Sequence, residues 1–315
     1  MGDGSDVDIV QGLKNPINRA AVMNNGEYTR PEQELIERLP KLPAITTFRS
    51  SNIWIIEWLP SDEPDTGRQL HEWMEVSRSG WSTHISCRSK ADVIRAIAHA
   101  QAFMRRTKQI PVLHIETHGD TQGLEGPDGV GGYEQLSWGE ITGPLQMLNI
   151  ETGCNLVVVV AACTGFAGIS ALTKGPRAPA IGLIGPTAEL TGSDLLNGMK
   201  ELYRGWRGEG PRMRDMVASA SRETTGVHFE FEPFSTLFYE ALVADLVRRL
   251  RQEKARMAEG HMPAAIPTFP PAYVLQRIWD EMFMMDVEPE NRSRFGIDMT
   301  RVVTLFLDEL GIAPN

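Results

Sequence analysis

The feature that most constrains the fold is an apolar run at residues 155–165, with the sequence NLVVVVAACTG. Four valines and two alanines follow one another without the alternation of a half-exposed strand, which is typical of a strand covered on both faces. Such strands belong to parallel sheets, where ligands and catalytic groups collect at the carboxyl ends of the strands. Because the run ends at Cys163, this cysteine lies where an open α/β sheet carries its chemistry.

Strands and helices alternate around this run, and the alternation predicts βαβ units and a mainly parallel sheet. Ser89 can cap one helix, because Asp92 follows it as a capping-box partner, and Ser193 is expected to cap a later one. A glycine-rich segment at residues 123–132 is expected to form a loop or hairpin over the site. The expected strands span residues 51–59, 81–87, 110–116, 156–162 and 180–184, and the expected helices span residues 68–77, 89–104, 136–148, 193–203 and 211–221.

The chain is expected to have three parts. Residues 1–45 form a polar lead-in with a short helix at 31–39, residues 46–225 form the α/β domain, and residues 226–315 form an all-helical extension. In the extension, apolar residues recur at helical spacing, which indicates packing against the α/β domain rather than a cofactor site. Its expected helices span residues 237–257, 273–285 and 299–310.

Charge and cysteine content exclude several function classes. The net charge of −10 argues against nonspecific binding to nucleic acid or to an anionic membrane. The three cysteines form an odd set without framework spacing, and the start of the chain lacks the features of a signal peptide. No stretch has the roughly 18 apolar residues of a membrane span. We therefore expect a cytoplasmic protein with free thiols.

Two predicted strand ends carry the candidate chemistry. His118 and Gly119 follow the strand at 110–116, and Cys163 follows the strand at 156–162. If these strands are adjacent and parallel, an imidazole can take the proton of a thiol at one edge of the sheet. The backbone N–H groups of Gly119 and Cys163 could hold a developing oxyanion, worth about 3–4 kcal/mol per donor. Glycine suits that position because the missing Cβ lets a substrate carbonyl approach closely.

Other interpretations of these residues stay open. A cysteine after a valine run is often an inert core residue, and a histidine at a strand end is often structural. His114, Glu116 and His118 alternate along one strand and therefore share a face, as the ligands of a metal-dependent hydrolase would. Two neighbouring members of this row are close enough to share one ion, but no clear third ligand lies nearby in the sequence.

The pairing of HIETHGD (114–120) with VVVVAACTG (157–165) resembles the caspase-like cysteine peptidases, which include caspases, metacaspases, gingipains, separase and bacterial CHAT-domain proteins. The later segments AIGLIGPTAELTGSDLLNGMKELYRG (180–205) and VASA (217–220) are similar to CHAT domains in particular. The resemblance covers about residues 50–222 and implies a three-layer α/β/α sandwich. It also implies that His118 is the catalytic base and proton donor, Cys163 the nucleophile that forms a thioacyl intermediate, and Gly119 with the Cys163 N–H the oxyanion hole. No cofactor is implied.

The sequence departs from these relatives where they select a substrate. Metacaspases carry an acidic residue two positions before the cysteine, and this chain has Ala161 there. Asp194 is the best candidate for a carboxylate that faces a basic P1 side chain, with Glu189 as a weaker one. Asp194 has an alternative role as a first-turn acid that the helix dipole stabilises.

The resemblance implies a regulated bacterial protease that cleaves a partner protein, such as a gasdermin-like pore former encoded beside it. The net charge argues against a nucleic-acid or membrane partner. The alternative is a catalytically silent member of the same fold, which binds partners through its helical extension.

Overall fold

A computed structural model describes residues 28–43, 45, 50–163, 177–206, 213–224, 227–261 and 269–312. The chain divides into an α/β unit, Ile45–Phe234, and a helical unit made of Met1–Ala44 and Ser235–Asn315. The predicted helix start at residue 211 and the Thr164-Gly165 pair lie outside the described residues.

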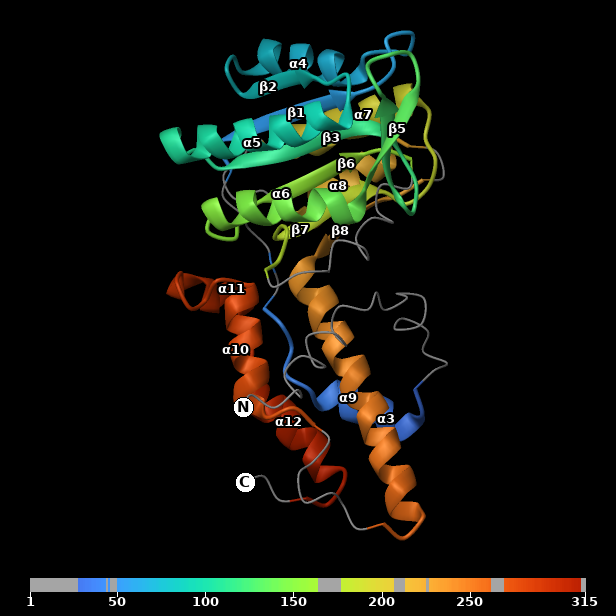
Figure 1. Cartoon of the computed structure of the whole chain (residues 1–315), viewed down its shortest axis with the longest axis vertical. Helices are drawn as coiled ribbons and strands as arrows, with labels where there is room; N and C mark the ends of the chain where they lie inside the picture. Colours follow the sequence, from blue (N-terminus) through green and yellow to red (C-terminus); the bar gives the residue numbers. More distant parts are fainter. Residues whose placement is uncertain are drawn as a thin grey trace. The chain divides into compact units, whose positions relative to one another are not determined.

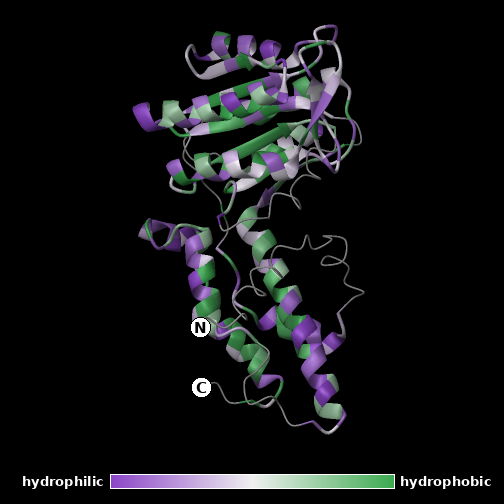
Figure 2. Ribbon diagram, viewed as in Figure 1, coloured by the Kyte–Doolittle hydropathy of each residue, from purple (hydrophilic) through white to green (hydrophobic). Residues whose placement is uncertain are grey.

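A mostly parallel sheet forms the centre of the α/β unit (Figure 1), as the strand and helix pattern predicts. Its main path has the order β2-β1-β3-β6-β7-β8, and only β8 on this path runs antiparallel to its neighbour. Every residue of β1, β6 and β7 is buried, and Figure 2 shows the hydrophobic character of these inner strands. The strands of the path are β1 (Asn52–Trp58), β2 (Ser82–Ser86), β3 (Pro111–Gly119), β6 (Val157–Ala161), β7 (Gly182–Pro186) and β8 (Phe229–Pro233).

Helices cover both faces of the sheet, so the α/β unit is a three-layer α/β/α sandwich (Figure 1). The helices α5 (Lys90–Thr107) and α6 (Trp138–Glu151) pack together on one face. On the other face lie α4 (Thr66–Ser77), α7 (Gly192–Gly205) and α8 (Met213–Arg222).

Two helix starts test the capping predictions. The Ser89 hydroxyl accepts the N–H of Asp92 at the start of α5, which confirms the predicted cap. The prediction for α7 is wrong by two residues, since Thr191 is the N-cap and Ser193 already belongs to the helix. Thr191 is extended just before the helix, so its hydroxyl reaches the N–H of Asp194 at 3.2 Å.

The glycine-rich segment forms a hairpin of β4 (Gly123–Pro127) and β5 (Tyr133–Ser137). The strand β4 pairs with the end of β3, where His118 lies opposite Glu125. The buried Trp58 donates its indole N–H to the Pro127 carbonyl at 2.9 Å. A Cβ on Gly126 would lie 2.5 Å from the Trp58 ring, so this glycine permits the contact. The hairpin is thereby docked on the sheet next to His118.

The chain beyond residue 225 is not all-helical, because β8 pairs with β7 before the first helix begins. Its sequence FEFEP alternates apolar and polar residues, the pattern of a short edge strand, and the ring of Phe231 packs over Gly182. The expected boundary at 225 therefore falls one strand before the division between the two units.

The helical unit contains α3 (Arg30–Arg38), α9 (Phe234–Ala258, beginning at the last residue of the α/β unit), α10 (Ala272–Met282), α11 (Arg292–Phe295) and α12 (Met299–Asp308). Its apolar side chains contact one another: the ring of Phe283 lies 4.8 Å from the rings of both Trp279 and Phe295. Arg251 of α9 pairs with Glu32 of α3 at 2.7 Å. No helix in the described part of the chain has both the length and the hydropathy needed to cross a membrane.

Candidate active site

The register between β3 and β6 brings the two predicted strand ends together. Val112 through Glu116 lie opposite Val157 through Ala161, with a constant offset of 157 − 112 = 45 residues. The ladder and β6 both end at Ala161, and the chain bends and turns at residues 162 and 163. An unbroken ladder with the same offset would put His118 opposite Cys163, because 118 + 45 = 163. His118 and Cys163 each lie two residues beyond the last β3–β6 pair, at the same edge of the sheet.

Gly119 shows that the two strand ends stay adjacent beyond the ladder. A Cβ built on Gly119 would lie 3.2 Å from the Cβ of Ala162, the residue before Cys163, and 3.2 Å from the Gly123 carbonyl oxygen. The close approach of Gly119 to both neighbours explains why glycine occupies this position. The oxyanion hole of Gly119 and the Cys163 N–H stays a prediction.

His118 is held by a residue that the sequence interpretation missed. Its Nε2 atom lies 2.9 Å from both carboxylate oxygens of Glu63, in the loop between β1 and α4. The two side chains are 41% and 36% exposed, respectively. A carboxylate can only accept, so Nε2 is the donor and Nδ1 is the ring nitrogen with a free lone pair when the ring is neutral. No motif marks Glu63 in the turn-rich segment SDEPDTG (61–67).

Cys163 differs from the other two cysteines in exposure. Cys87 and Cys154 are buried, whereas Cys163 is partly exposed, and the three cysteines, all within the described residues, form no disulfide. Burial raises the pKa of the Cys87 thiol to about 12, and the nearby Asp92 carboxylate acts in the same direction. Cys163 is therefore the thiol that a reagent in solution can reach most readily, rather than an inert core cysteine.

The two candidate specificity residues lie on the segment that follows β7, at the same carboxyl edge of the sheet as Cys163. Asp194 accepts the Thr191 hydroxyl at 2.8 Å in the first turn of α7, so its carboxylate takes part in the helix cap. This geometry fits the alternative role of a first-turn acid. Glu189 is exposed between β7 and α7. Of the two carboxylates, Glu189 is the more accessible to a substrate.

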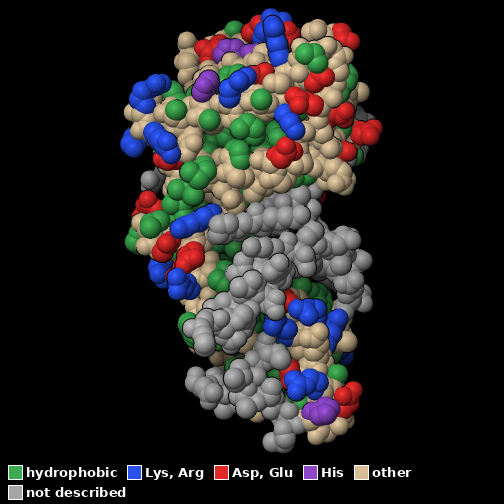
Figure 3. All heavy atoms as spheres, in the orientation of Figure 1, with side chains coloured by type: hydrophobic (Ala, Val, Ile, Leu, Met, Phe, Trp, Pro, Cys, Tyr) green, Lys and Arg blue, Asp and Glu red, His purple; other side chains and the backbone are tan. Residues whose placement is uncertain are grey.

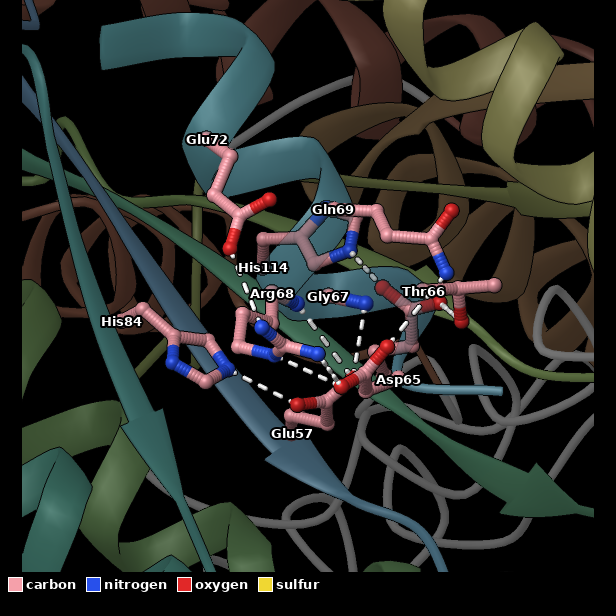
Figure 4. A network of polar contacts seen from close by, with 10 residues as sticks. Glu57, Asp65, Thr66, Gly67, Arg68, Gln69, Glu72, His84 and His114 are labelled. Atoms are coloured by element: carbon pink, nitrogen blue, oxygen red, sulfur yellow. Dashed lines mark hydrogen bonds and ion pairs between the residues drawn. The ribbon is translucent and has the colours of Figure 1, made fainter. Parts of the chain in front are cut away.

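A buried polar network links the start of α4 to β1 and β3 (Figure 4). Glu57 and Glu116 are opposite each other on β1 and β3, and both are buried. The Glu57 carboxylate accepts the Gly67 N–H at 2.8 Å at the start of α4, and it contacts His84 Nε2 at 2.8 Å. It therefore ties α4 to the sheet. In the sequence, the only indication of this network is Glu57 itself, the one charged residue in the apolar segment SNIWIIEWL (51–59).

The second half of the network occupies both ring nitrogens of His114. Glu116 accepts the Thr66 hydroxyl and contacts His114 Nε2 at 3.2 Å, while His114 Nδ1 contacts the Tyr203 hydroxyl at 2.9 Å. Burial, followed by the charge of Glu116, raises the pKa of Tyr203 well above its usual value. With its nitrogens used in this way, His114 serves the packing of α7 rather than a metal. Within the described ranges, no three His, Cys, Asp or Glu side chains are grouped to hold an ion.

Comparison of the sequence with models of protein families and with curated proteins gave no match. The interpretation of the site therefore depends on the geometry at the ends of β3 and β6.

Proposed function

We propose that this protein is a cysteine endopeptidase of the caspase-like kind, similar to bacterial CHAT-domain peptidases, with His118 and Cys163 as its catalytic dyad. The observation that carries the proposal is the parallel pairing of β3 with β6 at an offset of 45 residues, which puts the ends of both strands, where His118 and Cys163 lie, at one edge of the sheet. The partial exposure of both residues supports it, since a substrate must reach them.

The proposed reaction needs only groups of the protein and water. Nδ1 of His118 takes the thiol proton, and Sγ of Cys163 attacks the carbonyl carbon of the scissile peptide bond. The N–H groups of Gly119 and Cys163 hold the resulting oxyanion. The C–N bond then breaks, the leaving amine takes the proton from the imidazolium, and a thioester remains. Water gives one proton to His118 and attacks the thioester, which releases the carboxylic acid and restores the thiol.

The charge around this edge supports a basic P1 residue in a protein substrate. Glu189 is exposed on the segment after β7, at the same edge of the sheet, and acidic side chains gather over the β4–β5 hairpin in the view of Figure 3. The net charge of the whole chain, −10, is negative like these side chains. A neighbouring gene product, such as a gasdermin-like pore former, is the substrate that we propose. The absence of disulfides among the three described cysteines supports a reducing, cytoplasmic setting.

An activity-directed probe tests the function without knowledge of the natural substrate. We expect a peptidyl acyloxymethyl ketone with Arg at P1 to alkylate Cys163 in the native protein, as located by peptide mapping. The His118→Ala variant should lose this labelling while it keeps the wild-type circular dichroism spectrum. His99→Ala is the matched control, because His99 is exposed on α5, on the opposite face of the sheet. Labelling of Cys163 only after denaturation would support the catalytically silent alternative instead.

A further inference from the structure

We propose that Glu63 is the positioning residue of the dyad and holds the His118 imidazole with Nε2 protonated and Nδ1 available to the thiol. This inference rests on the proposed function and adds a third member to the site. It starts from the contact of His118 Nε2 with both carboxylate oxygens of Glu63, each at 2.9 Å.

The exposure of the His118 imidazole gives such a partner a role. The pairing of β3 with β6 stops at Glu116, and the imidazole is 41% exposed. An exposed ring can turn about its side-chain bonds and can carry its proton on either nitrogen. A carboxylate at Nε2 selects one tautomer and one orientation, as acidic partners of histidine do in metal sites and in serine proteases.

Glu63 can do this because its loop is fixed at both ends. Before the loop, Trp58 is buried and bonded to the hairpin through Pro127. After the loop, α4 begins with Gly67, whose N–H is bound by the buried Glu57 carboxylate. Within the loop, the N–H of Glu63 donates to the Pro60 carbonyl at 3.1 Å, and the following proline restricts the Glu63 backbone to extended conformations.

The competing explanation is a surface pair without a role in the reaction. Both side chains are more than a third exposed, and such pairs contribute about 0–1 kcal/mol to stability. Stability measurements therefore cannot separate the two explanations. The rate of the chemical step can, because orientation of the imidazole matters only when the thiol reacts.

The decisive experiment compares inactivation kinetics of Cys163 in Glu63→Gln and in the neighbouring control Asp62→Asn, with the same P1-Arg acyloxymethyl ketone. Asp62 is exposed in the same loop, so its variant removes the same charge without a change at His118. We expect Glu63→Gln to lower kinact about 10- to 100-fold with KI within twofold of wild type. The amide of Gln can donate to Nε2 and so favour the tautomer that cannot take the thiol proton. Asp62→Asn should match the wild type.

The outcomes separate this inference from the function on which it rests. If Glu63→Gln reacts like wild type while His118→Ala does not react, Glu63 has no positioning role and the dyad stands. An equal loss in Glu63→Gln and Asp62→Asn would also overturn the inference, since loop charge alone would explain it. If His118→Ala itself reacts at the wild-type rate, the dyad and the role of Glu63 fall together.

Discussion

The buried carboxylate of Glu57 provides the sharpest test of how the α/β unit supports its candidate site. Glu57→Ala removes the acceptor for the Gly67 N–H at 2.8 Å and the partner of His84 Nε2 at 2.8 Å. Hydrogen bonds to a charged group contribute about 1.5–3 kcal/mol each, and a buried donor left without an acceptor is costly. The carboxylate also lies at the positive end of α4. We expect the free energy of unfolding to fall by about 3–5 kcal/mol.

Thermal unfolding followed by circular dichroism measures this loss. The α/β unit has 234 − 45 + 1 = 190 residues, and domains of this size lose about 2–4 °C in Tm per kcal/mol. The variant should therefore unfold about 6–20 °C below the wild type. Glu57→Gln keeps an acceptor for Gly67 but loses the charge, so its Tm should lie between the two.

Glu72→Ala is the matched control, because Glu72 lies on the same helix with its side chain 60% exposed and paired to Arg68. We expect this control to change stability by no more than about 0.5 kcal/mol. If Glu57→Ala unfolds as close to the wild type as Glu72→Ala does, the network does not hold α4 on the sheet. The loop that carries Glu63 would then not be fixed at its α4 end.

Two further predictions concern packing and pH. Gly126→Ala should destabilise the protein by about 1–3 kcal/mol in urea unfolding, because the new Cβ would lie 2.5 Å from the Trp58 ring. Gly143 lies in α6, where an added Cβ would meet no atom within 4 Å, so Gly143→Ala should instead stabilise the protein by about 0.5–1 kcal/mol. A change in the free energy of unfolding of the same sign in both variants would contradict this account of packing. Hydrogen bonds from Arg251 lower the pKa of Glu32 from 4.5 to about 2. Because the pKa of Glu32 is lower in the folded state, ionisation of this carboxyl stabilises the fold above pH 4.5. This stabilisation, about 1–2 kcal/mol with Arg251 half-exposed, is lost as the pH falls toward 2. Urea unfolding at pH 6 and pH 3 should show this loss in the wild type and a smaller one in Glu32→Gln; equal losses would contradict the assignment.

The local elements could be predicted from the sequence because their causes are local. The valine run predicted the buried β6, and Ser89 with Asp92 predicted the start of α5, since an N-cap hydroxyl meets the N–H three residues on. Most other strands begin and end within a few residues of their predicted limits. The errors have local reasons too. The strand β8 was missed because it has only five residues and lies at a sheet edge. The cap of α7 was assigned to Ser193 although Thr191, two residues earlier, also carries a hydroxyl.

The sequence by itself determined that a histidine and a cysteine lie at the ends of two strands, because periodicity and capping act within a few residues. It left open whether those strands are neighbours and in which register they pair. Strand order and register depend on contacts between segments 45 residues apart, and they bring the ends of β3 and β6, with His118 and Cys163, to one edge of the sheet. The same long-range packing placed Glu63 against His118 over a separation of 55 residues. Only the tertiary structure decides such contacts, because they form when distant segments bury their apolar faces together.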